Sequence, residues 1–302
     1  MSGANEHERL SNESEAKKIA DKEKKTMTTA KNTANGSGPI LEGKRAVVFG
    51  ASGSIGAAVA KELAKEGAEV FLAGRTKSSL DEIVKQIAAA GGRAQADVID
   101  THDDAAVNRY IEAIVKQSGK LDIVLDAAGP LAKDYGNGKG AVELPVEEFM
   151  VPLRTMVRSR FITAQAAARH MVEQHSGVII FVTGSPARPH VPGATAIGAA
   201  FGAIENLTGN LAFELSPLGV RVVCLRTTAN VDSRSIQDTM EMMATRMNIS
   251  REQASAQIAQ LNFLKVPATV QDTANAAVVI ASDRARMLTG TVVNATAGAA
   301  LD

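Results

Sequence analysis

The stretch RAVVFGASGSIGAAVAKELAKEGAEV, from Arg45 to Val70, decides the fold of this chain. A short apolar segment, typical of a buried strand, runs into a turn of small residues and then into a helix-like stretch. Gly50 permits a sharp turn after the strand, and Gly56 lets the helix come close to the sheet. Backbone N–H groups and the positive end of the helix are then placed to hold a pyrophosphate. The stretch therefore predicts a nucleotide-binding unit of strand, turn and helix.

The same alternation continues to the end of the chain without a change in composition. The expected strands are Arg45–Phe49, Glu69–Ala73, Arg93–Ala96, Leu121–Asp126, Gly177–Thr183, Val220–Arg226 and Thr291–Asn294. Helical stretches between them include Ile55–Glu66, Ser79–Ala90 and Ala105–Ser118. Strands that alternate with helices favour a parallel sheet. We therefore predict an α/β fold: a single doubly wound domain over residues 41–302, with a seven-stranded parallel sheet and helices on both of its faces.

Composition limits the classes of function. The chain has 302 residues with 33 Lys+Arg and 33 Asp+Glu, so no net charge attracts it to nucleic acid or to an anionic membrane. The single Cys224 excludes an internal disulfide and a cysteine metal cluster, and it suits a reducing compartment. No run of about 18 apolar residues is present, and the N-terminus lacks the apolar core of a signal peptide. We expect a cytoplasmic protein with a small-molecule substrate and no bound metal.

Residues 1–40 differ from the rest of the chain. They are rich in Lys, Glu, Asn, Ser and Thr, and they end in the segment Asn35-Gly36-Ser37-Gly38-Pro39. Such a segment cannot bury enough apolar surface to offset the entropy of ordering it. We predict a disordered polar N-terminal extension, with Met27 as an alternative start of synthesis.

The spacing Gly50-x3-Ser54-Ile55-Gly56 resembles the Gly-x3-Gly-x-Gly turn of the short-chain dehydrogenase/reductase family. The likeness continues through nearly all of residues 42–298, in the segments FITAQAAARHM, IIFVTGS, ENLTGNLAFEL, GVRVV and LTGTVVNATAG. Asp126-Ala127-Ala128-Gly129 resembles the family's Asn-Asn-Ala-Gly, and Asp97-Val98 its Asp-Val pair beside adenine. The resemblance implies a Rossmann-type fold and a nicotinamide cofactor. The residues expected to bind that cofactor are Gly50, Ser52, Ser54, Ile55, Gly56, Arg75, Asp97, Val98, Ala128 and Gly129.

The end of the second strand indicates which cofactor is preferred. Enzymes that prefer NAD place a carboxylate there for the ribose 2′-hydroxyl, whereas NADP users present a cation to the 2′-phosphate. This chain reads AGRTKS from Ala73 to Ser78 and has no carboxylate there. Arg75, helped by Lys77 or Ser78, predicts NADP(H) in preference to NAD(H). The alternative is that Arg75 only solvates the strand end.

The stretch AIGAAFGAIEN, from Ala196 to Asn206, covers the place where the family carries its catalytic tyrosine and lysine. The matching positions are Ile197 and Phe201, the position of the catalytic serine is Gly184, and that of the relay asparagine is Met156. An unassisted tyrosine, with a pKa of about 10, is a poor acid or base at neutral pH. In the family, the charge of the lysine lowers the pKa of the tyrosine. The resemblance therefore implies a divergent member without the Tyr-x-x-x-Lys pair.

Other groups at the carboxyl edge of the sheet are candidates for proton transfer. Tyr135 lies in GPLAKDYGNGKG after the fourth strand, and His190 lies in SPARPHVPG after the fifth. Ser185 flanks the serine position without occupying it. For Tyr135 and His190, an ordinary surface position is the alternative.

Three functions are open at this point. The first is an oxidoreductase that transfers hydride to a carbonyl or an activated alkene, the second is an inactive nucleotide-binding sensor or partner, and the third is a lyase or isomerase. The apolar replacements and the methionines of Ser233–Leu264 indicate a partly hydrophobic substrate. The alternative for the methionines is that they are only the buried side of two short helices. The helix expected at Ala196–Leu215 is rich in small apolar residues on more than one face, which favours a homodimer or homotetramer, as in the family.

Overall fold

Seven parallel strands form one sheet within residues 38–302, which are the residues that the computed structural model describes, apart from the side chains of Met242 and Arg246. The strand order is β3-β2-β1-β4-β5-β6-β7. The strands are β1 (Arg45–Phe49), β2 (Glu69–Gly74), β3 (Arg93–Val98), β4 (Ile123–Asp126), β5 (Gly177–Gly184), β6 (Val220–Thr227) and β7 (Thr291–Ala295). The predicted seven-stranded parallel sheet is confirmed, with every strand boundary within two residues of the expected one.

The two largest strand-boundary differences, two residues each, are at the end of β3, which runs to Val98 and not Ala96, and at the start of β4. Leu121 was expected in the strand, but β4 begins at Ile123. The reason is a side chain: the amide group of Gln174 accepts from the N–H of Leu121 and donates to its C=O, both at 2.8 Å. The backbone of Leu121 is thus satisfied without a neighbouring strand.

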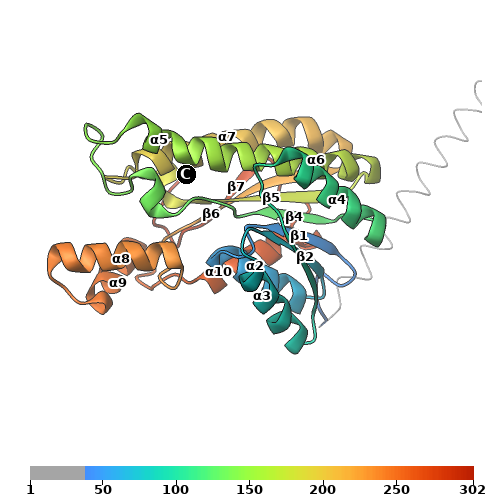
Figure 1. Ribbon diagram of the computed structural model, residues 1–302, viewed down its shortest axis with the longest axis horizontal. Helices are drawn as coiled ribbons and strands as arrows, with labels where there is room; N and C mark the ends of the chain where they lie inside the picture. The colour runs from blue at the N-terminus through green and yellow to red at the C-terminus, as the bar shows by residue number, and fades with distance from the viewer. Residues whose placement is uncertain (1–37) are drawn as a thin grey trace, which may run out of the picture. The chain divides into compact units, whose positions relative to one another are not determined.

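Two layers of helices cover the sheet (Figure 1). One face carries α2 (Ser54–Lys65), α3 (Lys77–Ala89) and α10 (Val270–Ala281). The other carries α4 (Asp104–Ser118), α6 (Arg158–Gln174) and α7 (Thr195–Leu215). Each layer buries its own apolar cluster against the sheet, and strands β1, β4, β5 and β6 are buried on both faces. This is the arrangement expected for apolar parallel strands.

Most of the remaining elements lie around the carboxyl ends of the strands. They are the short helix η1 (Ala132–Tyr135), α5 (Val146–Pro152), the π-helical turn η2 (Leu153–Val157) and η3 (Ser185–Ala187). After β6 come α8 (Arg234–Met247) and α9 (Arg251–Gln260), which extend away from the sheet as a pair in Figure 1. The short helices η4 (Ser216–Leu218) and η5 (Asp283–Ala285) precede β6 and β7.

The order of the strands locates the ligand edge. The chain builds outward from β1 to β2 and β3, and then returns to place β4 on the other side of β1. The carboxyl ends of β1 and β4 therefore border the crevice in which sheets of this type bind ligands.

The predicted extension, residues 1–40, lies outside the described residues except for its last three. Across residues 38–302, no helix has both the length and the apolarity needed to cross a bilayer.

Candidate functional site

The turn between β1 and α2 is shaped by the close approach of backbone to backbone. Gly50 has φ +74°, and a Cβ added there would lie 2.5 Å from the amide nitrogen of Ala128. A Cβ on Gly56 would collide with the carbonyl oxygen of Gly50. Glycine is thus required at positions 50 and 56 because a side chain would collide with the backbone there, and at position 50 also because φ is positive.

The first turn of α2 has free donors for an anion. The first intrahelical bond runs from the N–H of Ala57 to the carbonyl of Gly53, at 2.9 Å, so the amides of Ser54, Ile55 and Gly56 precede it. The N-cap residue Gly53 makes no side-chain cap, and the first turn carries no acidic residue. These observations fit a pyrophosphate at the positive end of the helix.

The ends of β2 and β3 complete this half of the site. Asp97 pairs in register with Ala73 and Val98 with Gly74, which places both beside the start of the segment that carries Arg75. Arg75 is exposed, and within residues 38–302 it forms no ion pair. Lys77, expected to assist it, instead bonds Asp81 at 2.8 Å on the outer face of α3. Arg75 is therefore the cation at this strand end that has no carboxylate partner in the described part of the chain.

Three of the four positions that the resemblance assigns to proton transfer, Met156, Ile197 and Phe201, lie in one packed apolar cluster, and the fourth is Gly184. Met156 is 6% exposed in the π-helical turn η2, and Ile197 is 8% exposed on α7. The ring of Phe201 lies directly over Gly184, because a Cβ on this glycine would be 2.8 Å from Phe201 Cε2. The ring of Phe201, the residue at the implied lysine position, thus fills the space that a serine side chain at position 184 would need.

The hydroxyl groups that flank Gly184 in the chain do not occupy the serine position that the resemblance implies. The hydroxyl of Thr183 points inward, 3.2 Å from the sulfur of Cys224 and 3.4 Å from a carboxylate oxygen of Glu205. Ser185 begins η3 and is half-buried. Burial raises the pKa of the Cys224 thiol to about 12, so this sulfur is not a nucleophile at neutral pH.

We expect Gly184 and Phe201 to be energetically coupled. Gly184→Ala should destabilise the fold by about 1–3 kcal/mol, because its new methyl overlaps the Phe201 ring. In a Phe201→Ala background the same change should be nearly neutral, since the ring is gone. A double-mutant cycle from urea unfolding measures the coupling, which should reach about 1 kcal/mol or more. Additive effects would contradict the packing described here.

The loops that carry Tyr135 and His190 touch each other. The N–H of Gly138 donates to the carbonyl of Gly193 at 2.9 Å, and a Cβ on Gly193 would strike the backbone of Gly138. Tyr135 is half-buried, and burial raises its pKa to about 12, whereas His190 is exposed. The structure thus brings the two loops together at the carboxyl edge.

A buried ion network beside the site was not anticipated from the sequence. Arg226, on β6, is 0% exposed and binds both carboxylate oxygens of Glu205 on α7, at 2.7 and 2.9 Å. It also bonds the carboxylate of Asp302, and Arg188 approaches Glu205 at 3.6 Å. The signal in the sequence is a charged residue in an apolar setting: Arg226 follows the run Val220–Leu225 that contains Cys224.

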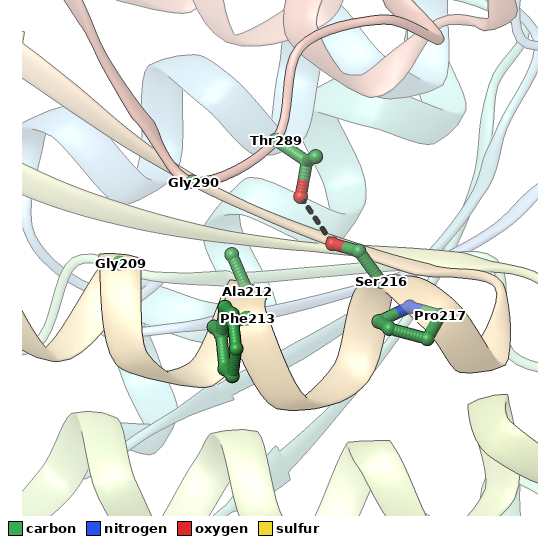
Figure 2. Close-up of a pocket in the computed structure, with 7 residues that line it drawn as sticks. All are labelled: Gly209, Ala212, Phe213, Ser216, Pro217, Thr289 and Gly290. Carbon is green, nitrogen blue, oxygen red and sulfur yellow. Dashed lines mark hydrogen bonds between the residues drawn. The ribbon is translucent and has the colours of Figure 1, made fainter.

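A groove lies at the opposite edge of the sheet (Figure 2). It is open and mainly apolar, and its lining residues are Gly209, Ala212, Phe213, Ser216, Pro217, Thr289 and Gly290. A hydrogen bond of 2.7 Å joins the hydroxyls of Ser216 and Thr289 at its rim. Because these residues precede β6 and β7, the groove is separate from the crevice at the carboxyl ends. Among residues 38–302, no group of three or more His, Cys, Asp or Glu side chains is placed so that it could hold a metal ion.

Comparison with known proteins agrees with this geometry. Residues 44–243 match the family model described as short chain dehydrogenase. An uncharacterized oxidoreductase of Methylorubrum extorquens is 33% identical over 259 residues, which cover 85% of this chain and 98% of that protein. Gluconate 5-dehydrogenase of Gluconobacter oxydans is 34% identical over 187 residues, or 60% of this chain and 69% of that protein.

Solved structures share the same architecture. A dehydrogenase/reductase from Sinorhizobium meliloti has a TM-score of 0.72 and 29% identity, over 86% of this chain and 96% of that one. NAD+-bound xylitol dehydrogenase has a TM-score of 0.78 over 85% of this chain and 99% of its own, and at 23% identity it supports the fold alone.

Proposed function

The chain belongs to the short-chain dehydrogenase family, and we propose that it is an oxidoreductase that uses NADP(H) in preference to NAD(H). One observation carries the proposal: a backbone cradle at Gly50–Gly56 that only glycines permit, with the exposed cation of Arg75 at the next strand end. The fold of this family binds NAD(P), and the charge at Arg75 suits a 2′-phosphate.

Each half of the site has its own role in this proposal. The amides of Ser54, Ile55 and Gly56 would hold the pyrophosphate, and the Ser52 side chain lies close to Gly74 at the end of β2. Asp97, Val98, Ala128 and Gly129 are the residues that would border the adenosine. A bound nicotinamide would supply or accept the hydride, and the chain itself would orient the substrate and provide a proton.

We propose a partly hydrophobic carbonyl compound or activated alkene as the substrate. The apolar surface of Met156, Ile197 and Phe201 supports this, since it offers no polar partner to a hydrophilic group. An alkene conjugated to a carbonyl would need less proton assistance at the moment of hydride transfer than a plain ketone would.

The test is a titration of the purified protein with NADPH, followed by incubation with a panel of enones, quinones and imines. Enhanced nicotinamide fluorescence and subsequent loss of NADPH are expected. Absence of binding would refute the proposal.

Arg75→Ala should weaken NADPH binding about tenfold or more, because a charge-assisted contact to the 2′-phosphate is lost. The Kd of NADH should change little. Lys85→Ala is the matched control, since Lys85 is an exposed cation on the outer part of α3. Equal losses for the two cofactors would show that Arg75 does not read the 2′-phosphate.

Tyr135 is the proton donor that we favour, with His190 and Ser185 as the other candidates. Because its pKa lies at about 12, the phenol stays protonated at neutral pH. Tyr135→Phe should lower turnover by about 10²-fold or more, and the wild-type rate should not fall between about pH 7 and pH 10 from loss of this proton.

Tyr110→Phe is the control for that substitution. Tyr110 is the other tyrosine of the chain, buried on α4 against Phe49, and its hydroxyl has no partner among the described residues. Full turnover by Tyr135→Phe would exclude Tyr135 and direct attention to His190.

A second candidate is favoured by the packing of Phe201 on Gly184, which fills the space beside the expected nicotinamide. It is a nucleotide-binding sensor or partner subunit that binds NADPH and does not consume it. The titration described above distinguishes it, because binding would then persist without turnover on every substrate.

We also propose a homodimer or homotetramer assembled through α7 and its neighbour α6. Phe213 on α7 is 85% exposed and Phe161 on α6 is 47% exposed, so each helix presents a large apolar side chain that a partner subunit would cover. Light scattering on a sizing column should give a multiple of the chain mass, and a monomer mass would refute this.

A further inference from the structure

Two opposite charges are buried behind the loop that follows β4. Asp126, the last residue of β4, is 0% exposed, and Arg160 on α6 is 1% exposed. The nearest distance between them is 3.4 Å, from an Arg160 terminal nitrogen to Asp126 Oδ1. The resemblance puts an uncharged asparagine at position 126, so the charge here is a departure that Arg160 balances.

The carboxylate of Asp126 is held by three donors. Its Oδ1 accepts from the N–H of Ala128 at 2.8 Å, and its Oδ2 accepts from the hydroxyls of Ser159 at 2.7 Å and Thr163 at 3.0 Å. Ser159 and Thr163 lie four residues apart on one face of α6. The carboxylate therefore ties the loop to the helix behind it.

Arg160 holds the other backbone group of Ala128, its carbonyl. One terminal nitrogen of its guanidinium donates to the carbonyl of Ala128, and the other donates to the carbonyl of Val182 on β5 at 3.4 Å. The Nε of Arg160 has no partner among the described residues, and burial lowers the pKa of the guanidinium. Both hydrogen-bonding groups of Ala128 are thus held by this one pair of side chains.

The position of Ala128 matters because its backbone forms a wall of the glycine turn. A Cβ on Gly50 would be 2.5 Å from the Ala128 nitrogen and 2.7 Å from its Cα. A shift of a few tenths of an ångström at Ala128 would therefore change the cradle. Buried ion pairs are weak sources of stability, since desolvation opposes their attraction. A role in placing this wall explains the pair better than stability does.

We propose that Asp126 and Arg160 are positioning residues that hold the Ala128 peptide against Gly50 and thereby set the affinity for the dinucleotide. The inference rests on the proposed cofactor function. It adds to that function two residues that do not touch the ligand.

The test compares Arg160→Met with Arg221→Met. Arg221 is a matched control at the amino end of β6, where its guanidinium also donates to backbone carbonyls, those of Leu288, Ile280 and Ser282, and where burial also lowers its pKa. Both variants should be less stable than the wild type. Only Arg160→Met should weaken NADPH binding, by about tenfold or more, because Arg221 lies at the opposite edge of the sheet.

Arg160→Lys provides a second reading if the methionine variant does not fold. Lysine keeps the charge beside Asp126 but has no planar fork to reach both Ala128 and Val182, so NADPH binding should again weaken. A Kd unchanged from the wild type in a folded Arg160 variant would overturn the inference and leave the proposed function intact. Equal loss of affinity in Arg221→Met would also overturn it. Failure of the wild type to bind NADPH would overturn both.

Discussion

Replacing Glu205 by glutamine is expected to lower the free energy of unfolding by about 3 kcal/mol or more. Arg226 is fully buried and donates two hydrogen bonds to the Glu205 carboxylate, at 2.7 and 2.9 Å. Without that charge, the guanidinium retains only Asp302, whose side chain is 53% exposed. Removing one partner of a buried ion pair leaves an uncompensated charge, which typically destabilises by about 3–5 kcal/mol.

Urea unfolding of two further variants makes this result specific. Asp81→Asn breaks an exposed pair with Lys77 and should change stability by less than about 0.5 kcal/mol. Glu205→Leu combined with Arg226→Met removes both charges and should recover much of the loss, because an apolar pair needs no compensation. A change below about 1 kcal/mol in Glu205→Gln would show that the network is not energetically important.

Replacing Gly50 by alanine should destabilise the fold and also abolish nucleotide binding at micromolar concentration. A left-handed backbone costs alanine about 1–2 kcal/mol, and the collision with the Ala128 backbone adds about 1–3 kcal/mol. Relief of that collision requires the turn and the loop after β4 to separate. The amides at the start of α2 would then no longer face a pyrophosphate in the same geometry.

Gly43→Ala separates the two effects. Gly43 has φ +73°, almost the same as the +74° of Gly50, but a Cβ added there meets nothing within 4 Å. It precedes β1, at the edge of the sheet opposite to the crevice. Gly43→Ala should lower the free energy of unfolding only by the cost of the left-handed backbone, about 1–2 kcal/mol, and should bind NADPH with the wild-type Kd. Nucleotide binding by Gly50→Ala as tight as that by Gly43→Ala would contradict the role of the close approach.

The fold could be predicted because its signals are local. Strand-like runs of four to eight residues, a turn of small residues and helical periodicity each depend on neighbours in the chain, and the observed β1, α2 and β2 differ from expectation by one residue at most. The prediction that Met156, Gly184, Ile197 and Phe201 stand at the family's proton-transfer positions rests on position along the chain alone. The cofactor preference and the proton donor remain predictions.

What the sequence by itself determined is thus the order of strands and helices and the glycine turn, while the absence of the family's proton-transfer residues stays a prediction from the resemblance. Only the tertiary structure decided which side chains share a partner across long separations in the chain. Phe201 fills the space above Gly184, Arg160 meets Asp126, and Arg226 joins Glu205 to Asp302. Each of these pairs joins different elements, and a buried charge or a filled cavity has no periodicity to reveal its partner. The folded sheet and helices bring them together, and the desolvation of their charges makes those partners necessary.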